Sequence, residues 1–295
     1  MRHFILDTDW WTDCDDAVAV RLLCNAHLSG EITIAGININ ACMPWSVPSL
    51  DLFTRDCGVV VPIGLDHAAT DFDGVPSYQE HLAKSGVFQR GNDDVPDGVD
   101  FYWQLLEQAA DQELEILSIG FTQVLAGVLQ RDGGKELISR KVKHLWIMAG
   151  KWSEDGGLEY NFYKNALTRA SAAQLCAEWP TPVTFLGWEV GNSVITGGKI
   201  PEGDLLKQVL VDHGSANGRS SWDPMLVLLA ITGDPEKAGY DTVRGKATVD
   251  KATGANHFVP DPTGSHRYVV KKHPDSCYAE AIDRRLGHKA KQPSN

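Results

Sequence analysis

The sequence predicts an α/β fold in which a central, mostly parallel sheet is flanked by helices. Short apolar runs alternate with amphipathic segments along most of the chain, and this order places helices on both faces of a parallel sheet. The 295 residues, of which 43% are hydrophobic, are enough to bury a sizeable core. After Gly239, short alternating segments between turn residues predict small antiparallel additions near the C-terminus.

The expected strands are the apolar runs at 4–6, 32–39, 59–63, 114–119, 142–148 and 183–186, and then 242–249, 257–259 and 267–271. The first expected helix begins at Asp15 and Asp16, whose carboxylates suit the positive end of a helix, and it carries apolar residues at helical spacing. Further helices are expected at 47–55, 100–110, 121–130, 167–178, 222–231 and 275–286. Residues 66–98 are polar and rich in Gly, Pro and Asp, which predicts a long surface excursion, and 149–164 is an expected loop.

No internal repeat or low-complexity linker divides the chain, so residues 1–286 are predicted to form one domain, followed by a polar tail at 287–295. The net charge of −12 argues against a nucleic-acid or anionic-membrane partner. The first residues lack the apolar core of a signal peptide, and the six cysteines form no C-x-x-C pair. A cytoplasmic protein with reduced cysteines is therefore expected, and a homo-oligomer stays open.

The strongest local signal is an acidic cluster between the first strand and the first helix. Five carboxylates lie between Asp7 and Asp16, and ligands of open α/β sheets bind where strands end. Like charges this dense need a compensating cation, and oxygen ligands without His or Cys favour Ca²⁺ or Mg²⁺. The alternative is a solvated acidic loop that caps the helix.

Two other patterns with clustered acids fit less well. An EF-hand loop that began at Asp7 would need Gly at its sixth position and Glu at its twelfth, where this chain has Thr12 and Val18. Phosphoryl-transfer enzymes of the haloacid dehalogenase type also begin with Asp-x-Asp after a strand. They have Thr or Val where this chain has Trp11, so this class is a weaker alternative.

The segment from Asp7 to Ala17 resembles the N-terminal signature of the calcium-dependent nucleoside hydrolases, the inosine–uridine-preferring nucleoside hydrolase superfamily. The longer form of that signature, Asp-Thr-Asp-x-Gly-Thr-Asp-x-Asp-Asp-Ala, matches at every fixed position except one, where Trp11 replaces Gly. Four further segments resemble family motifs in the right order, and the similarity spans roughly residues 3–250. These segments are 118–126, 148–150 with 159–161, 182–187 and 222–224. The resemblance implies a nucleoside-hydrolase-like, Rossmann-like fold.

The resemblance also implies roles for the acidic residues. Asp9 is implied to be a metal ligand and the general base, and Asp16 and Asp223 to be metal ligands. Gln123 would bind the metal through its main-chain carbonyl. Asp15 would contact the ribose hydroxyls, and Asp7 would lie behind the ligands. Asp13 has no role in the shorter motif and is expected to be solvated or capping, and Asp223 has the alternative of a simple helix cap.

Glu159 and Asn161 stand two residues apart, so in an extended loop both point to one side and can receive sugar hydroxyls. Asn40 ends the second expected strand and is a further candidate for the sugar. The alternatives are a polar surface loop for the first two and a turn or cap for Asn40. Trp222 precedes Asp223 where many family members have a His that protonates the leaving base, and where purine-specific members have Trp.

The sequence therefore predicts a Ca²⁺-dependent hydrolase that cleaves the N-glycosidic bond of ribonucleosides, purines preferred, to base and ribose. The expected partner is a small nucleoside or riboside. Trp222 would stack on the base, with a second aromatic from Trp10, Trp11 or Trp152 on its other face. Two alternatives stay open: a hydrolase of a non-nucleoside pentosyl glycoside or sugar derivative, and a non-catalytic sugar-binding relative.

Overall fold

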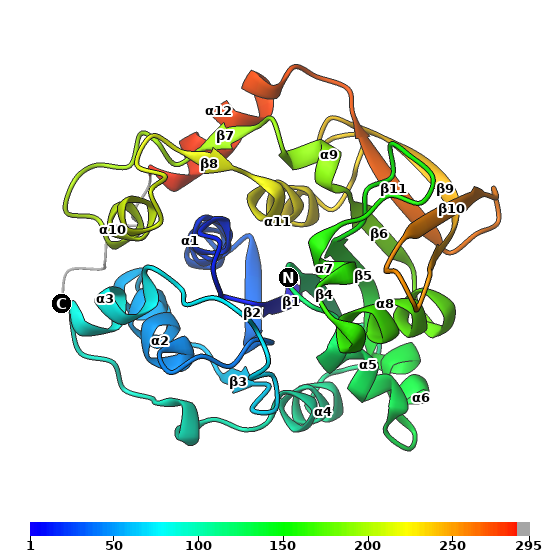
Figure 1. The fold of residues 1–295 in the computed structure, drawn as a ribbon, viewed down its shortest axis with the longest axis horizontal. Helices are drawn as coiled ribbons and strands as arrows, with labels where there is room; N and C mark the ends of the chain where they lie inside the picture. Colours follow the sequence, from blue (N-terminus) through cyan, green and yellow to red (C-terminus); the bar gives the residue numbers. More distant parts are fainter. Residues whose placement is uncertain (288–295) are drawn as a thin grey trace.

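The computed structural model describes residues 1–287, and its centre is a nine-stranded sheet in the order β10-β9-β11-β6-β5-β4-β1-β2-β3 (Figure 1). The strands are β1 Arg2–Thr8, β2 Ile32–Ile39, β3 Ile63–Leu65, β4 Leu114–Ser118, β5 Val142–Met148, β6 Val183–Leu186, β9 Tyr240–Val249, β10 Asn256–Pro260 and β11 His266–Lys271. All neighbours from β3 to β11 pair parallel, whereas β9 pairs antiparallel with β10 and β11. The predicted fold class is confirmed.

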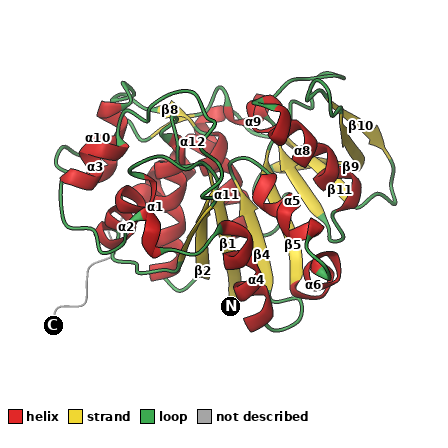
Figure 2. Ribbon diagram, turned by 60° about the horizontal axis from the view of Figure 1, so that its bottom comes forward, coloured by secondary structure: helices red, strands yellow, loops and turns green. Residues whose placement is uncertain are grey.

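Helices cover both faces of the sheet (Figure 2). Phe4 and Leu6 of β1 belong to a core shared with α1 Asp15–Leu28, α2 Ser46–Asp56, α10 Leu205–Asp212, α11 Trp222–Thr232 and α12 Asp275–Leu286. Ile5 points to the opposite core, which includes α4 Gly98–Gln108, α5 Gln123–Gln130, α6 Gly134–Lys141 and α8 Ala166–Glu178. This alternation of side chains along a doubly covered strand accounts for its continuous apolar sequence.

The order of the strands reverses at β1. The chain runs from β1 outward to β2 and β3, and then returns to place β4 on the other side of β1. In the register, Asp7 faces Asn38 of β2 on one side and Ser118 of β4 on the other. The crevice outside the carboxyl ends of strands at such a reversal is where open α/β sheets bind ligands.

Most predicted elements agree with the structure, but several predictions are wrong. The strand expected at 59–63 begins only at Ile63, because Val60 is 68% exposed and Pro62 has no N–H for a ladder. The expected excursion at 66–98 contains α3 Gln79–Lys84 and a short 3₁₀ helix at Asn92–Asp94.

The loop expected at 149–164 ends in the short helix α7 Tyr160–Tyr163. Sequence analysis also missed α6, α9 Trp188–Gly191, α10 and the two-stranded sheet of β7 Ile195–Thr196 and β8 Arg219–Ser220. The tail predicted at 287–295 lies outside the described residues from position 288 on. Within residues 1–287, no helix is both long and apolar enough to cross a membrane.

Candidate active site

A cavity of about 200 Å³ opens at the carboxyl ends of β1, β4 and β5. Asp9 follows β1, Ile119 follows β4 and Met148 ends β5, and all three line the cavity. Its other lining residues are Trp11, Thr12, Asp13, Asp15, Asp16, Glu159, Tyr160, Asn161, Trp188, Trp222 and Asp223. The reversal of strand order and the acidic cluster therefore meet at one place.

Three buried carboxylates meet at the floor of this cavity. Asp15 and Asp16 begin α1, Asp223 is the second residue of α11, and each offers an oxygen within 4.8 Å of the others. The two helices pack side by side (Figure 1), which brings their N-termini together. The backbone amide of Asp223 donates to Oδ2 of Asp15 at 3.1 Å.

Within residues 1–287, no Lys, Arg or His forms an ion pair with these three carboxylates, although the charge of Arg219 opposes the rise in the pKa of Asp15. Burial, followed by the charges of neighbouring aspartates, raises the pKa of Asp15 and of Asp223 well above the usual range. Burial raises the pKa of Asp16 to about 7, although the Thr8 hydroxyl and the Trp10 amide donate to its Oδ1. A cluster of buried carboxylate oxygens that repel one another fits a hard divalent cation such as Ca²⁺.

Asp9 lies beside this trio and lines the same cavity. Its Oδ1 accepts the backbone N–H of Trp11 at 3.1 Å, and burial followed by the charge of Asp16 raises its pKa well above the usual range. The trio includes Asp15, for which the sequence implied a sugar contact, and it does not include Asp9. The structure thus brings all four predicted aspartates together but orders them differently around the candidate cation site.

Glu159 and Asn161 line the opposite side of the cavity. They do not lie in an extended loop, because Glu159 caps α7 and its Oε1 accepts the backbone N–H of Asn161 at 3.0 Å. Oε2 of Glu159 accepts from Gly150 N at 3.0 Å, and Nδ2 of Asn161 donates to the Met148 carbonyl at 3.0 Å. Burial raises the pKa of Glu159 to about 7. Both side chains are therefore held in place by the strand end of β5.

Asn40, Gln123 and Asp7 are buried beneath the cavity and do not line it. Oδ1 of Asn40 accepts Phe121 N at 3.0 Å, and Nε2 of Gln123 donates to the Asn40 carbonyl at 2.6 Å. Oδ1 of Asp7 accepts from Asn38 at 2.7 Å. These contacts join β1, β2 and the start of α5, so the layer supports the cavity floor. The roles that the sequence implied for Asp7, Asn40 and Gln123 stay predictions.

The aromatic walls differ from those expected. Trp10 is fully buried and donates to Ser49 Oγ at 2.9 Å, and Trp152 packs against Phe185 and Tyr268; neither lines the cavity. Trp11 borders the cavity but is only 2% exposed, because it packs among Phe72, Phe121 and Tyr160 and donates to Gly74 O. Its ring is therefore mostly unavailable to a ligand.

Two cavity aromatics were missed in the sequence. Tyr160 and Trp188 line the cavity and are 41% and 37% exposed. Trp222 is half-buried, and its Nε1 donates to the Trp188 carbonyl at 2.8 Å. Trp188 follows the end of β6, so the strand-end rule that selected Asp9 could have found it. Tyr160 stands between Glu159 and Asn161, which were both selected.

No family model matches this sequence, and no curated protein matches it either. Solved structures do match over nearly the whole chain. An inosine–guanosine nucleoside hydrolase superposes with a TM-score of 0.74 at 14% identity, covering 98% of this chain and 99% of that one. A purine-preferring ribonucleoside hydrolase from Gardnerella vaginalis gives 0.73 at 18% identity, with 98% and 99% covered. An inosine–uridine-preferring nucleoside hydrolase from Bacillus anthracis gives 0.72 at 14% identity, with 97% and 99% covered.

The chain therefore has the fold of the nucleoside hydrolases, and the fold that its sequence motifs implied is confirmed. At this level of identity, the likeness establishes the fold. The three enzymes differ in the bases that their names give, so a base preference has to be argued from the cavity of this chain.

Proposed function

We propose that this protein is a divalent-cation-dependent hydrolase that cleaves the N-glycosidic bond of ribonucleosides and releases the base and ribose. One observation carries the proposal: Asp9, Asp15, Asp16 and Asp223 meet at the strand reversal, opposite Glu159 and Asn161, in one cavity. The set combines a cation site, a proton acceptor and polar groups for a sugar. The shared fold with three nucleoside hydrolases supports the same reading.

Asp15, Asp16 and Asp223 are the proposed holders of the cation, and Ca²⁺ is the ion that their oxygen-only set suits best. When bound, such an ion holds a water molecule near the sugar and makes it more acidic. Asp9 lies at the edge of this set and is a further ligand candidate. The main-chain carbonyl of Gln123 stays a prediction from the sequence resemblance.

Asp9 is the proposed general base. Its Oδ1 is held by the Trp11 amide, and within residues 1–287 no hydrogen bond reaches its Oδ2. That oxygen can take the proton of the attacking water as the water oxygen bonds to the anomeric carbon. The sugar develops oxocarbenium character in such a step, which a cavity with this many carboxylates stabilises.

The sugar and the base are proposed to contact different walls of the cavity. Glu159 and Asn161 would receive the sugar hydroxyls. Asp15 would also receive them, through the oxygen that does not accept from the Asp223 amide. Trp222, Trp188 and Tyr160 offer exposed ring surface for the base. Stacking on an aromatic side chain contributes about 1–3 kcal/mol per base, and a two-ring purine has more surface to stack. Purine nucleosides are therefore the proposed preferred substrates.

The test is release of ribose from a panel of inosine, uridine and methyl β-D-ribofuranoside, with Ca²⁺ present. We expect release from both nucleosides, fastest from inosine. Release from the methyl riboside alone would favour a glycosidase of another substrate class. Tight ribose binding without any turnover would make the protein a sugar-binding relative.

A further inference from the structure

A cation lies beside the cavity: Arg219 does not line it, but it contacts Trp222 and Asp13, which do. Arg219 belongs to β8, and its guanidinium carbon lies 5.1 Å from the ring centre of Trp222. Its Nε and Nη2 donate to the two oxygens of Asp13 at 2.9 and 2.6 Å. Asp13 and Trp222 both line the cavity. The Asp13–Arg219 pair thus places a guanidinium next to two lining residues of a cavity whose own lining contains no Lys, Arg or His.

This pair gives Asp13 a role that the sequence did not predict. Nε and Nη2 of Arg219 donate to different oxygens of Asp13, so the two charges are joined by two hydrogen bonds. The same contact raises the pKa of Arg219, so the guanidinium is a permanent cation. A planar two-point contact of this kind also fixes the direction of the guanidinium.

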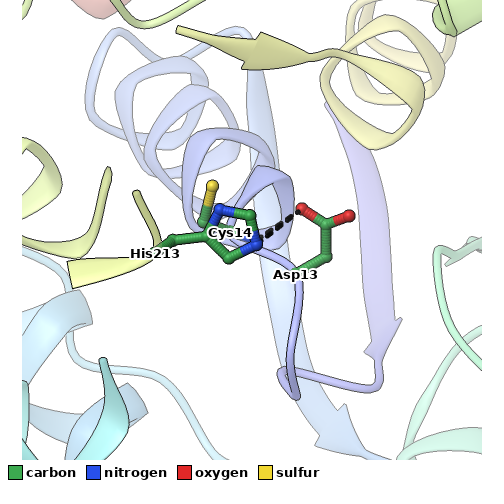
Figure 3. Close-up of side chains that lie close together, drawn as sticks. All are labelled: Asp13, Cys14 and His213. Carbon is green, nitrogen blue, oxygen red and sulfur yellow. Dashed lines mark hydrogen bonds and ion pairs between the residues drawn. The ribbon is translucent and has the colours of Figure 1, made fainter. Parts of the chain in front are cut away.

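His213 and Cys14 also lie close to Asp13, but they do not replace its contact with Arg219. Figure 3 shows the His213 ring turned toward Asp13, with the Cys14 thiol beside the ring, and His213 Nε2 lies 3.8 Å from Oδ1. The three side chains offer atoms within 4.8 Å of one another, which is a spacing that a metal ion could use. Both oxygens of Asp13 already accept from Arg219, however, and Oδ1 also accepts Cys14 N at 2.7 Å. Both carboxylate oxygens of Asp13 are therefore occupied by hydrogen bonds from Arg219.

Hydrolysis of the N-glycosidic bond needs a group that stabilises the departing base. A nucleobase that leaves with the electron pair of the glycosidic bond is a poor anion, and no His stands beside Asp223 to protonate it. Within residues 1–287, Nη1 of Arg219 makes no hydrogen bond, so one N–H face of the guanidinium is free. The guanidinium carbon lies over the Trp222 ring, 5.1 Å from the ring centre.

We propose that Arg219 hydrogen-bonds the departing base and stabilises its negative charge, and that Asp13 is the positioning residue that holds Arg219 there. The inference rests on the proposed function. As the bond between the anomeric carbon and the base nitrogen breaks, its electron pair passes to the base. The guanidinium neutralises that charge without giving up a proton, the attacking water yields its proton to Asp9, and solvent then protonates the base.

The experiment compares two substrates that differ in their need for help with the leaving group. Inosine releases a basic anion, whereas 4-nitrophenyl β-D-ribofuranoside releases a stable phenolate. In Arg219→Ala, kcat on inosine should fall about 10–100-fold, the effect of one charge-assisted hydrogen bond, and kcat on the nitrophenyl riboside should stay near that of the parent. Free guanidinium ion added to Arg219→Ala should restore part of the inosine rate.

Asp13→Asn should show the same pattern with a smaller loss, because Arg219 remains but is held less firmly. The double variant Asp13→Asn/Arg219→Ala removes the acid that Arg219→Ala leaves without its partner, and it should behave like Arg219→Ala. Arg131→Ala is the matched control, since Arg131 also pairs with an aspartate, Asp100 at 2.6 Å, and lies 4.3 Å from the ring centre of Trp103 outside the cavity. It should leave both rates unchanged.

Equal losses on the two substrates, or no loss on inosine, would overturn the role of Arg219 while leaving the proposed function intact. A parent protein that hydrolyses neither substrate in Ca²⁺ would overturn the proposed function, and this inference with it. Calcium affinity and the melting temperature of each variant show whether a loss comes from a disturbed cation site or from unfolding.

Discussion

The backbone amide of Asp223 donates to Oδ2 of Asp15 across 208 positions of sequence. This contact joins the N-terminus of α11 to that of α1, and both termini carry partial positive charge that favours carboxylates. The same contact brings three buried acids within 4.8 Å of one another. Two helix termini cannot balance that much negative charge in a buried place, so the packing of α1 on α11 creates a cluster that suits a cation.

Calcium should stabilise the protein, and more so at high pH. The pKa of Asp16 is raised from 3.8 to about 7 in the folded protein. The folded state therefore holds a proton that the unfolded state releases, and this contribution to stability is lost as the pH rises from 3.8 through about 7. Asp9, Asp15 and Asp223 shift in the same direction.

Without metal, the melting temperature should fall between pH 5 and pH 8, and added Ca²⁺ should raise it more at pH 8. Saturation at 100 times the Kd is worth about 2.7 kcal/mol. Differential scanning calorimetry measures both effects. A calcium shift that is larger at pH 5 than at pH 8 would show that these carboxylates are not the ligands.

Asp9→Asn should abolish most turnover while the fold and calcium binding persist. The change removes the proton acceptor but keeps an oxygen that can accept from the Trp11 amide. Loss of a general base typically lowers kcat about 10²–10⁴-fold. Isothermal titration with Ca²⁺ shows whether Asp9 is also a ligand, since a ligand would weaken binding as well. Near-normal kcat in Asp9→Asn would contradict the mechanism.

Glu159→Gln and Asn161→Ala should each weaken recognition of the sugar, with an effect of about 1–3 kcal/mol per lost hydrogen bond. Inhibition by free ribose measures this separately from chemistry. Glu154→Gln is the control, because Glu154 lies on the same loop, is 55% exposed and pairs with Lys151 outside the cavity. Unchanged ribose inhibition in both test variants would return the two residues to a purely structural role at the start of α7.

Trp222→Ala and Trp188→Ala should lower kcat/KM for inosine more than for uridine, because the purine has more ring surface to lose. Stacking of about 1–3 kcal/mol per base sets the scale. Trp103→Ala serves as the control, since Trp103 lies on α4 outside the cavity. If uridine is the better substrate of the parent, or if Trp222→Ala cleaves inosine as fast as the parent, stacking does not set the preference.

The sequence predicted those parts of the molecule that depend on neighbours along the chain. The strands at 32–39, 142–148 and 183–186 have the predicted bounds, because each is an apolar run with both faces buried. The acids from Asp9 to Asp16 could be placed at the cavity because a strand end and a helix start enclose them. Asp223 was predicted only through the motif at the start of α11.

What the sequence could not predict depends on tertiary contacts. Arg219 is an ordinary charged residue until folding brings it to Asp13, 206 positions away. Trp10 and Trp152 resembled cavity residues because they flank motif loops, but their side chains turn into the core. The loop between β1 and α1 places Trp10 at a positive φ of 45°. Such a backbone conformation at a bulky residue is not visible in a motif.

We propose that Asp15, Asp16 and Asp223 hold the cation that nucleoside hydrolysis requires. The most direct test is a calcium titration of ribose release from inosine, with the parent protein and Asp223→Asn after removal of metal by a chelator. We expect no ribose release without metal, and one ribose per hypoxanthine once Ca²⁺ is restored. Asp223→Asn should need at least about tenfold more Ca²⁺ than the parent, since even groups that only support metal ligands change metal affinity by 10–100-fold. Ribose release that survives the chelator, or an Asp223→Asn titration that matches the parent, would contradict it.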